Sequence, residues 1–144
     1  MKVQSAQIIK YATSSGPWTA DRLAIPTFAE IEAALRRLDG DLFPSVSLYF
    51  DSDPAEDSMP DFDILGGNEG FYVEATVDGT RYCYFDGSAP DVRVAVWLSD
   101  QGAEFSARRV CPKLEAVIAA AKHFCETGQL LPSFPWHPTG PQVE

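Results

Sequence analysis

The dipeptide Asp78-Gly79 lies between two short segments, FYVEATV and TRYCYF, and it constrains the fold more than any other feature of this sequence. Both segments are rich in aromatic and β-branched residues. Two-residue loops of this composition form type I′ turns, whose twist matches that of antiparallel strands. With such a turn, Val73 faces Tyr84 on one side of the hairpin, while Glu74 and Arg81 share the other. The sequence therefore predicts an antiparallel hairpin here.

Further strand candidates lie on both sides of this hairpin. Residues 3–11, 46–50 and 62–65 are predicted to be strands, and the segments DVRVAVWLS and AEFSARRV are predicted to form one more hairpin that turns near Gln101-Gly102. The glycines of GGNEG mark a sharp turn between strands, since no Lys-Ser or Lys-Thr pair and no helix follows them as a phosphate loop requires. These segments predict a mainly antiparallel sheet of four to six strands.

Two helices are predicted, at about residues 27–39 and 112–127. In the first, Thr27 and Glu30 form a capping box, and the apolar residues that follow recur at helical spacing. In the second, Pro112 suits the first helical position, and Gly128 suits the left-handed residue after the last turn. Each segment has one apolar stripe, so each helix is expected to pack on the sheet.

These elements together predict an α+β fold, with two principal helices on a mainly antiparallel sheet. A chain of 144 residues with 45% hydrophobic content is long enough for one domain, which at this size buries roughly 70% of its unfolded surface. We expect a single domain, 1–144. Its Pro-rich tail, 129–144, should be extended and lay Phe134 and Trp136 over the edge of the core.

The charge of the chain is concentrated in its middle. The net charge is −10, and no Lys or Arg occurs between Arg37 and Arg81, whereas eleven carboxylates do. Such a segment repels nucleic acid and favours a basic partner protein, although an acidic surface also serves solubility alone. The segment DSDPAEDSMPD, with two prolines and five acids, is predicted to be an exposed loop.

The predicted partner-binding surface combines these acids with one aromatic residue. Trp97 falls on the same strand face as Arg93 and Ala95, where it is either a half-exposed interface anchor or covered by a helix. The predicted binding residues are Asp51, Asp53, Glu56, Asp57, Asp61, Asp63, Glu69 and Trp97.

Catalytic and metal-binding interpretations find little support in the sequence. The cysteines at 83, 111 and 125 and the histidine at 123 match no zinc-ligand spacing, and His123 and Cys125 diverge on one helix. The acidic loop lacks the ligand order of an EF-hand, and no carboxylate pair has a partner that would separate its pKa values. We expect no enzymatic activity, no metal and no cofactor. An odd number of cysteines and no apolar leader or spanning segment favour a soluble cytoplasmic protein without membrane contact.

A different class of function stays open beside partner binding. Aromatic residues on the predicted strands would line a pocket on the sheet and make the chain a small-ligand-binding or regulatory module. The residues for this alternative are Tyr72, Tyr82, Tyr84 and Trp97.

Several local motifs occur in an order that resembles the first family of immunity proteins in bacterial polymorphic toxin systems. The similarity covers about residues 18 to 136. Its motifs are Trp18, a Pro-led helix that ends in Leu38-Asp39-Gly40, the strand VSLYF, the turn and strand LGGNEGFYVEA, and the closing FCETGQLLPSFPW.

The resemblance implies a non-catalytic protein that binds and neutralises a cognate toxin. In that family the toxin is often a nucleic-acid deaminase, and the binder would cover its active site or substrate groove. This chain has neither the His-x-Glu nor the Pro-Cys-x-x-Cys motif that a deaminase itself needs. The expected partner is thus a basic, nucleic-acid-acting toxin, with no direct contact between this chain and nucleic acid.

Overall fold

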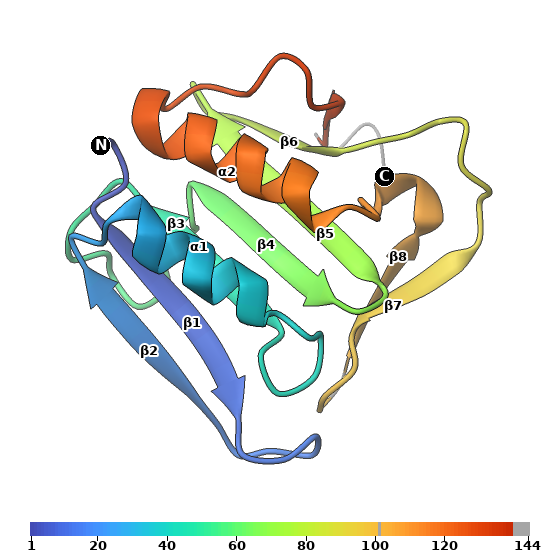
Figure 1. The fold of residues 1–144 in the computed structure, drawn as a ribbon, viewed down its shortest axis with the longest axis horizontal. Helices are drawn as coiled ribbons and strands as arrows, with labels where there is room; N and C mark the ends of the chain where they lie inside the picture. Colours follow the sequence, from blue (N-terminus) through green and yellow to red (C-terminus); the bar gives the residue numbers. More distant parts are fainter. Residues whose placement is uncertain (101, 140–144) are drawn as a thin grey trace.

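The computed structural model describes residues 1–100 and 102–139, and within them seven strands form one antiparallel sheet in the order β2-β1-β3-β4-β5-β6-β9 (Figure 1). In the same described residues, β7 and β8 pair as a separate antiparallel sheet. The strands are β1 (Ser5–Tyr11), β2 (Trp18–Ala24), β3 (Ser45–Tyr49), β4 (Phe62–Gly67), β5 (Gly70–Val77), β6 (Thr80–Tyr84), β7 (Arg93–Trp97), β8 (Ala103–Ser106) and β9 (Trp136–Pro138).

Helices α1 (Phe28–Arg37) and α2 (Leu114–Thr127) lie across one face of the large sheet, and the 3-10 turn η1 (Ala107–Arg109) precedes α2 (Figure 1). The capping box of α1 is confirmed, since Thr27 Oγ1 accepts from the Glu30 amide at 3.2 Å and the Glu30 carboxylate accepts from the Thr27 amide at 2.9 Å. Gly128 ends α2 with φ 73°. Among the described residues, no helix has both the length and the apolarity needed to cross a bilayer.

The core lies between the helices and one face of the sheet, which confirms the α+β fold. Alternate strand residues such as Val46, Ile64 and Val73 point toward the helices and are fully buried with Leu35 and Phe124. Burying side chains of this size contributes roughly 1.5–3 kcal/mol each, so this layer supplies most of the stability. We call the opposite face of the large sheet the polar face because Ser47, Asp63 and Glu74 lie on it, but it also holds the buried side chains of Ile9 and Tyr11.

The β5–β6 hairpin matches its predicted geometry. Asp78 and Gly79 have φ values of 50° and 80°, as both central positions of a type I′ turn require. Glu74 and Arg81 form an ion pair on the face away from the helices. The turn therefore sets which side chains reach the core and which reach the polar face.

Close backbone packing joins the end of α1 to β4 and β7. A Cβ added at Gly67 would lie 2.0 Å from the Asp39 carbonyl carbon, and one at Gly40 would lie 2.8 Å from the Val96 carbonyl oxygen. Gly40 also accepts from the Leu98 amide at 2.6 Å. Glycine is needed at both places because no side chain fits there. The contact holds β7 against the sheet and so determines where Trp97 lies.

The large sheet has more strands than the four to six predicted, because two of its strands are absent from the sequence prediction. Strand β2 is exposed at nearly every position and therefore shows no alternation, and β9 has only three residues, paired with β6. The predicted hairpin of β7 and β8 forms, but outside the large sheet, and Gln101 of its turn lies outside the described residues.

The second helix begins at Leu114 rather than near Pro112. The reason is that Cys111 still pairs with Phe71 in extended conformation, and Lys113 is the extended N-cap. The tail is described through Thr139, while 140–144 lie outside the described residues. Phe134 is 4% exposed and packs on Tyr84 and Trp136, so these aromatic residues cover the edge of the core as predicted.

Candidate functional site

The predicted acidic loop connects β3 to β4 and is held firmly at its base. We define the acidic loop as residues 50–61. The Asp61 carboxylate accepts from the Phe50 amide at 2.8 Å, and Ser5 Oγ donates to the Asp51 carbonyl at 2.7 Å. The Asp51 carboxylate accepts from the Asp53 amide at 2.9 Å. The side chains of Asp51 and Asp61 therefore shape the loop.

Three other acids of the loop face solvent. The carboxylates of Asp53, Glu56 and Asp57 are exposed and make no hydrogen bond or ion pair with any residue that the structure describes. Met59 lies among them and is 65% exposed. A flexible apolar side chain surrounded by acids is a typical composition for a binding surface, because the thioether adapts to its partner. This cluster is the part of the predicted site that is available for a partner.

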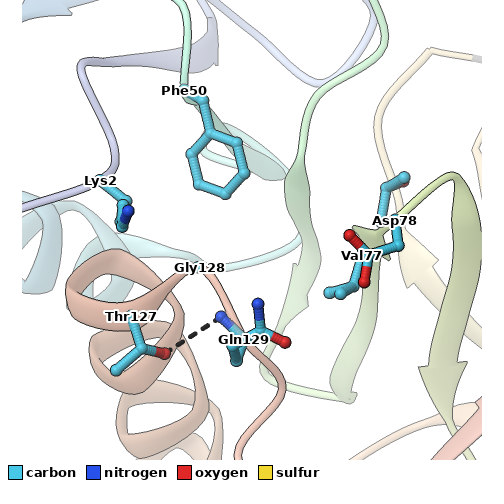
Figure 2. Close-up of a pocket in the computed structure, with 8 residues that line it drawn as sticks. Lys2, Phe50, Val77, Asp78, Thr127, Gly128 and Gln129 are labelled. Carbon is cyan, nitrogen blue, oxygen red and sulfur yellow. Dashed lines mark hydrogen bonds between the residues drawn. The ribbon is translucent and has the colours of Figure 1, made fainter.

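Phe50 joins the loop to the core and borders a groove of about 380 Å³ (Figure 2). Its ring stacks on that of Phe124 at 5.1 Å between centroids and 12° between planes. In Figure 2 the ring points into the space between Lys2 on one side and Val77 and Asp78 on the other. The groove extends the candidate surface from the acidic loop to the β5–β6 turn and the end of α2.

Asp63 lies on the polar face of the sheet and not on the loop. It accepts from Ser47 Oγ at 2.6 Å and sits opposite Glu74 in the β4–β5 register. Burial raises the pKa of Asp63 to about 6, and the charge of Glu74 acts in the same direction, whereas the Ser47 hydrogen bond and Arg81 oppose the shift. Asp63 is thus a half-buried charge within the sheet that opposes folding when ionised, and it lies apart from the exposed acids of the loop.

Glu69 and Trp97 lie far from the acidic loop. Glu69 is in the β4–β5 turn, at the other end of β4 from Asp61, and a strand of this length spans roughly 20 Å. Trp97 is half-buried and contacts Tyr11 with centroids 6.2 Å apart and planes at 87°. Tyr11 is at the end of β1 away from the loop. The predicted site therefore separates into a loop cluster and a distant aromatic corner, where Trp97 packs on Tyr11 at the face of the sheet away from the helices.

The side chains considered for metal binding or nucleophilic catalysis are not brought together. Among residues 1–100 and 102–139, no three His, Cys, Asp or Glu side chains lie close enough to hold a metal ion. Burial raises the pKa of Cys125 to about 12 and raises that of Cys111. Arg109 donates to the sulfur of buried Cys83 at 2.7 Å. High thiol pKa values make Cys111 and Cys125 poor nucleophiles.

The aromatic residues of the alternative ligand pocket do not share a cavity. Tyr72 stacks on Phe105 with centroids 3.9 Å apart, on the polar face. Tyr84 packs in the core on the opposite face, and Trp97 is at the aromatic corner. Five grooves on the described residues are each lined by at most one of the four aromatic residues proposed for the pocket.

Three residues of the candidate surface are missing from the sequence prediction. Met59 was detectable, since an apolar residue inside a run of acids and prolines has no core to enter. Phe50 and Tyr11 were not, because their importance rests on contacts with Phe124 and Trp97, which are distant in the chain.

Comparison with known proteins identifies the family of the chain. A family model described as "Immunity protein Imm1" matches residues 19–138, which is most of the chain. No curated protein and no solved structure matches.

Proposed function

The chain belongs to the Imm1 family of immunity proteins, whose role is to neutralise a toxin, and on this premise we propose that its target is a basic, nucleic-acid-acting toxin, in particular a deaminase. Such an enzyme has a zinc-activated water and a groove that accepts a polyanion. In this proposal the acidic loop covers that groove and excludes the substrate. The chain then acts by binding alone, without catalysis, a cofactor or nucleic-acid contact of its own.

The observation that supports this proposal is the set of exposed carboxylates on a fixed loop. Asp53, Glu56 and Asp57 stabilise nothing that the structure describes, and no Lys or Arg from 38 to 80 balances them. Fixed acids beside an apolar side chain attract a basic surface before contact and leave Met59 to be buried on contact. The acids of the loop therefore raise the association rate, and the side chains buried on contact lower the dissociation rate.

The proposal places the chain in the cytoplasm of the cell that must be protected. Cys111 and Cys125 are buried thiols outside any disulfide, which fits a reducing compartment. A toxin made in or delivered to that compartment would meet the chain before it meets nucleic acid.

The test is to co-express the chain with the polypeptide encoded immediately upstream, and to measure co-purification, loss of toxicity and association rate. A loop variant carries Asp53→Asn, Glu56→Gln and Asp57→Asn. A matched control carries Glu32→Gln, Glu115→Gln and Glu126→Gln, which removes the same charge from the helical layer. We expect the loop variant to associate about tenfold more slowly at low salt, with a shallower salt dependence than the control. Equal rates and equal salt slopes for the two variants would refute the steering role of the loop.

A further inference from the structure

Trp97 lies between two adjoining grooves at the end of the sheet away from the acidic loop. The first groove, of about 460 Å³, is lined by Tyr11, Leu65, Trp97, Asp100, Gly102 and Ala103. The second, of about 420 Å³, also borders Trp97 but contains Glu104, which Arg93 approaches at 3.8 Å. The acid that lines the first groove, Asp100, therefore has no basic residue beside it in the lining, whereas Glu104 of the second groove has Arg93 nearby.

Aromatic side chains gather at this corner. Tyr11 and Trp97 meet edge to face, and Trp18, the register partner of Tyr11, is 54% exposed on the same side of the sheet. Tyrosine and tryptophan are the residues most enriched at the energetic centres of protein interfaces. Leu98 next to the grooves is 51% exposed, which adds apolar area to the patch.

The charge at the groove is acidic. Asp100 is exposed, its carboxylate makes no hydrogen bond or ion pair with another described residue, and its φ of 52° turns the chain at the groove's edge. The Asp100 amide donates to the Ser14 carbonyl at 2.7 Å, and Ser14 Oγ donates to Asp41 at 2.6 Å, so a second carboxylate lies nearby. Aromatic rings beside a carboxylate attract a cation.

We infer that the groove lined by Tyr11, Trp97 and Asp100 receives an arginine side chain of the toxin, whose guanidinium stacks on Trp97 and bonds to Asp100. Arginine fits better than lysine because its planar guanidinium both stacks on aromatic rings and binds a carboxylate through two parallel N–H groups. The inference rests on the proposed function, in which the partner is a basic protein. A standard interface is roughly 30 Å across and β4, which separates the two places, spans roughly 20 Å, so the inference requires a partner no larger than usual.

The first test needs no toxin. N-acetyl-arginine methylamide is titrated into the chain while the indole N–H signals of Trp18, Trp97 and Trp136 are followed by NMR. We expect a saturable shift at Trp97 that Asp100→Asn weakens. Trp136 serves as an internal reference, since it packs on Phe62 and Phe134 and its indole donates to the Leu131 carbonyl at 3.2 Å. No shift at Trp97, or an equal shift at Trp136, would overturn the inference.

The second test uses the complex with the upstream-encoded toxin. Trp97→Leu and Asp100→Asn should raise the dissociation rate roughly 2- to 30-fold and leave the association rate nearly unchanged, as loss of a cation–π contact predicts. Glu126→Gln is the matched control, because Glu126 is also an exposed acid but lies on α2 and lines neither the groove at Phe50 nor the two grooves at Trp97. Wild-type dissociation rates for both groove variants would refute the arginine site and leave the proposed function standing. A wild-type chain that binds no toxin would instead refute the proposed function, and the titration would still decide the groove.

Discussion

Replacing Asp63 with asparagine should stabilise the protein at neutral pH. Asp63 is an acid on a strand, Ser47 Oγ donates to it at 2.6 Å, and its register partner Glu74 has the same charge. The asparagine side chain would keep an acceptor for Ser47 Oγ and would place an amide donor beside the Glu74 carboxylate. The variant thus removes a half-buried charge and keeps the hydrogen bond from Ser47.

The magnitude follows from the pKa of Asp63, which is raised from 3.8 to about 6 in the folded protein. Between these values the folded state binds more protons than the unfolded state, so the wild-type free energy of unfolding falls as pH rises from about 4 to about 6. Each pH unit corresponds to roughly 1.4 kcal/mol, which gives a total cost of about 3 kcal/mol at pH 7. The advantage of Asp63→Asn over the wild type should therefore be under about 1 kcal/mol at pH 4 and near 3 kcal/mol above pH 7.

The assay is urea unfolding of the wild type and the variant at several pH values from 4 to 8, followed by circular dichroism. Asp57→Asn is the control, since Asp57 is exposed and should show no pH-dependent difference from the wild type. A difference between Asp63→Asn and the wild type that does not change with pH, or a variant less stable at pH 7, would show that the Asp63 charge is not the cost proposed here.

Two further pairs of substitutions test local contacts in the fold, and the free energy of unfolding in urea is measured for each. Gly67→Ala should lower the free energy of unfolding by about 3 kcal/mol, because its Cβ would overlap the backbone of Asp39. Gly79→Asn should change it by less than about 0.5 kcal/mol, since nothing lies within 4 Å of Gly79 and the turn accepts asparagine. Equal losses in the two variants would contradict the packing argument. Thr27→Ala should lower the free energy of unfolding by about 1 kcal/mol, because the Glu30 amide loses its cap, and Thr27→Ser should restore most of that stability. An unchanged free energy of unfolding in Thr27→Ala would show that the cap adds nothing.

Part of the candidate site was predictable because it depends on local composition. An acidic segment with two prolines has no apolar stripe to bury, so the sequence indicates an exposed loop, and the structure places Asp53 and Asp57 in solvent. The sequence did not indicate that Asp51 and Asp61 are used inside the loop. Their partners, the Asp53 amide and the Phe50 amide, depend on how the loop closes.

The sequence alone determined the elements whose signals are short-range. The Asp78-Gly79 turn, the Thr27 cap and the alternation of the central strands each involve residues within a few positions of one another, and backbone sterics and hydrogen bonding decide them locally. For the same reason the two helices and the antiparallel character of the sheet were predictable.

Only the tertiary structure decided which predicted residues share a surface. Successive antiparallel strands reverse the chain, so Asp61 and Glu69 are close in sequence yet lie at opposite ends of β4. Conversely, Tyr11 meets Trp97 because Gly40 lets β7 approach the sheet. These placements depend on packing between segments far apart in the chain, and a local pattern contains no information about them.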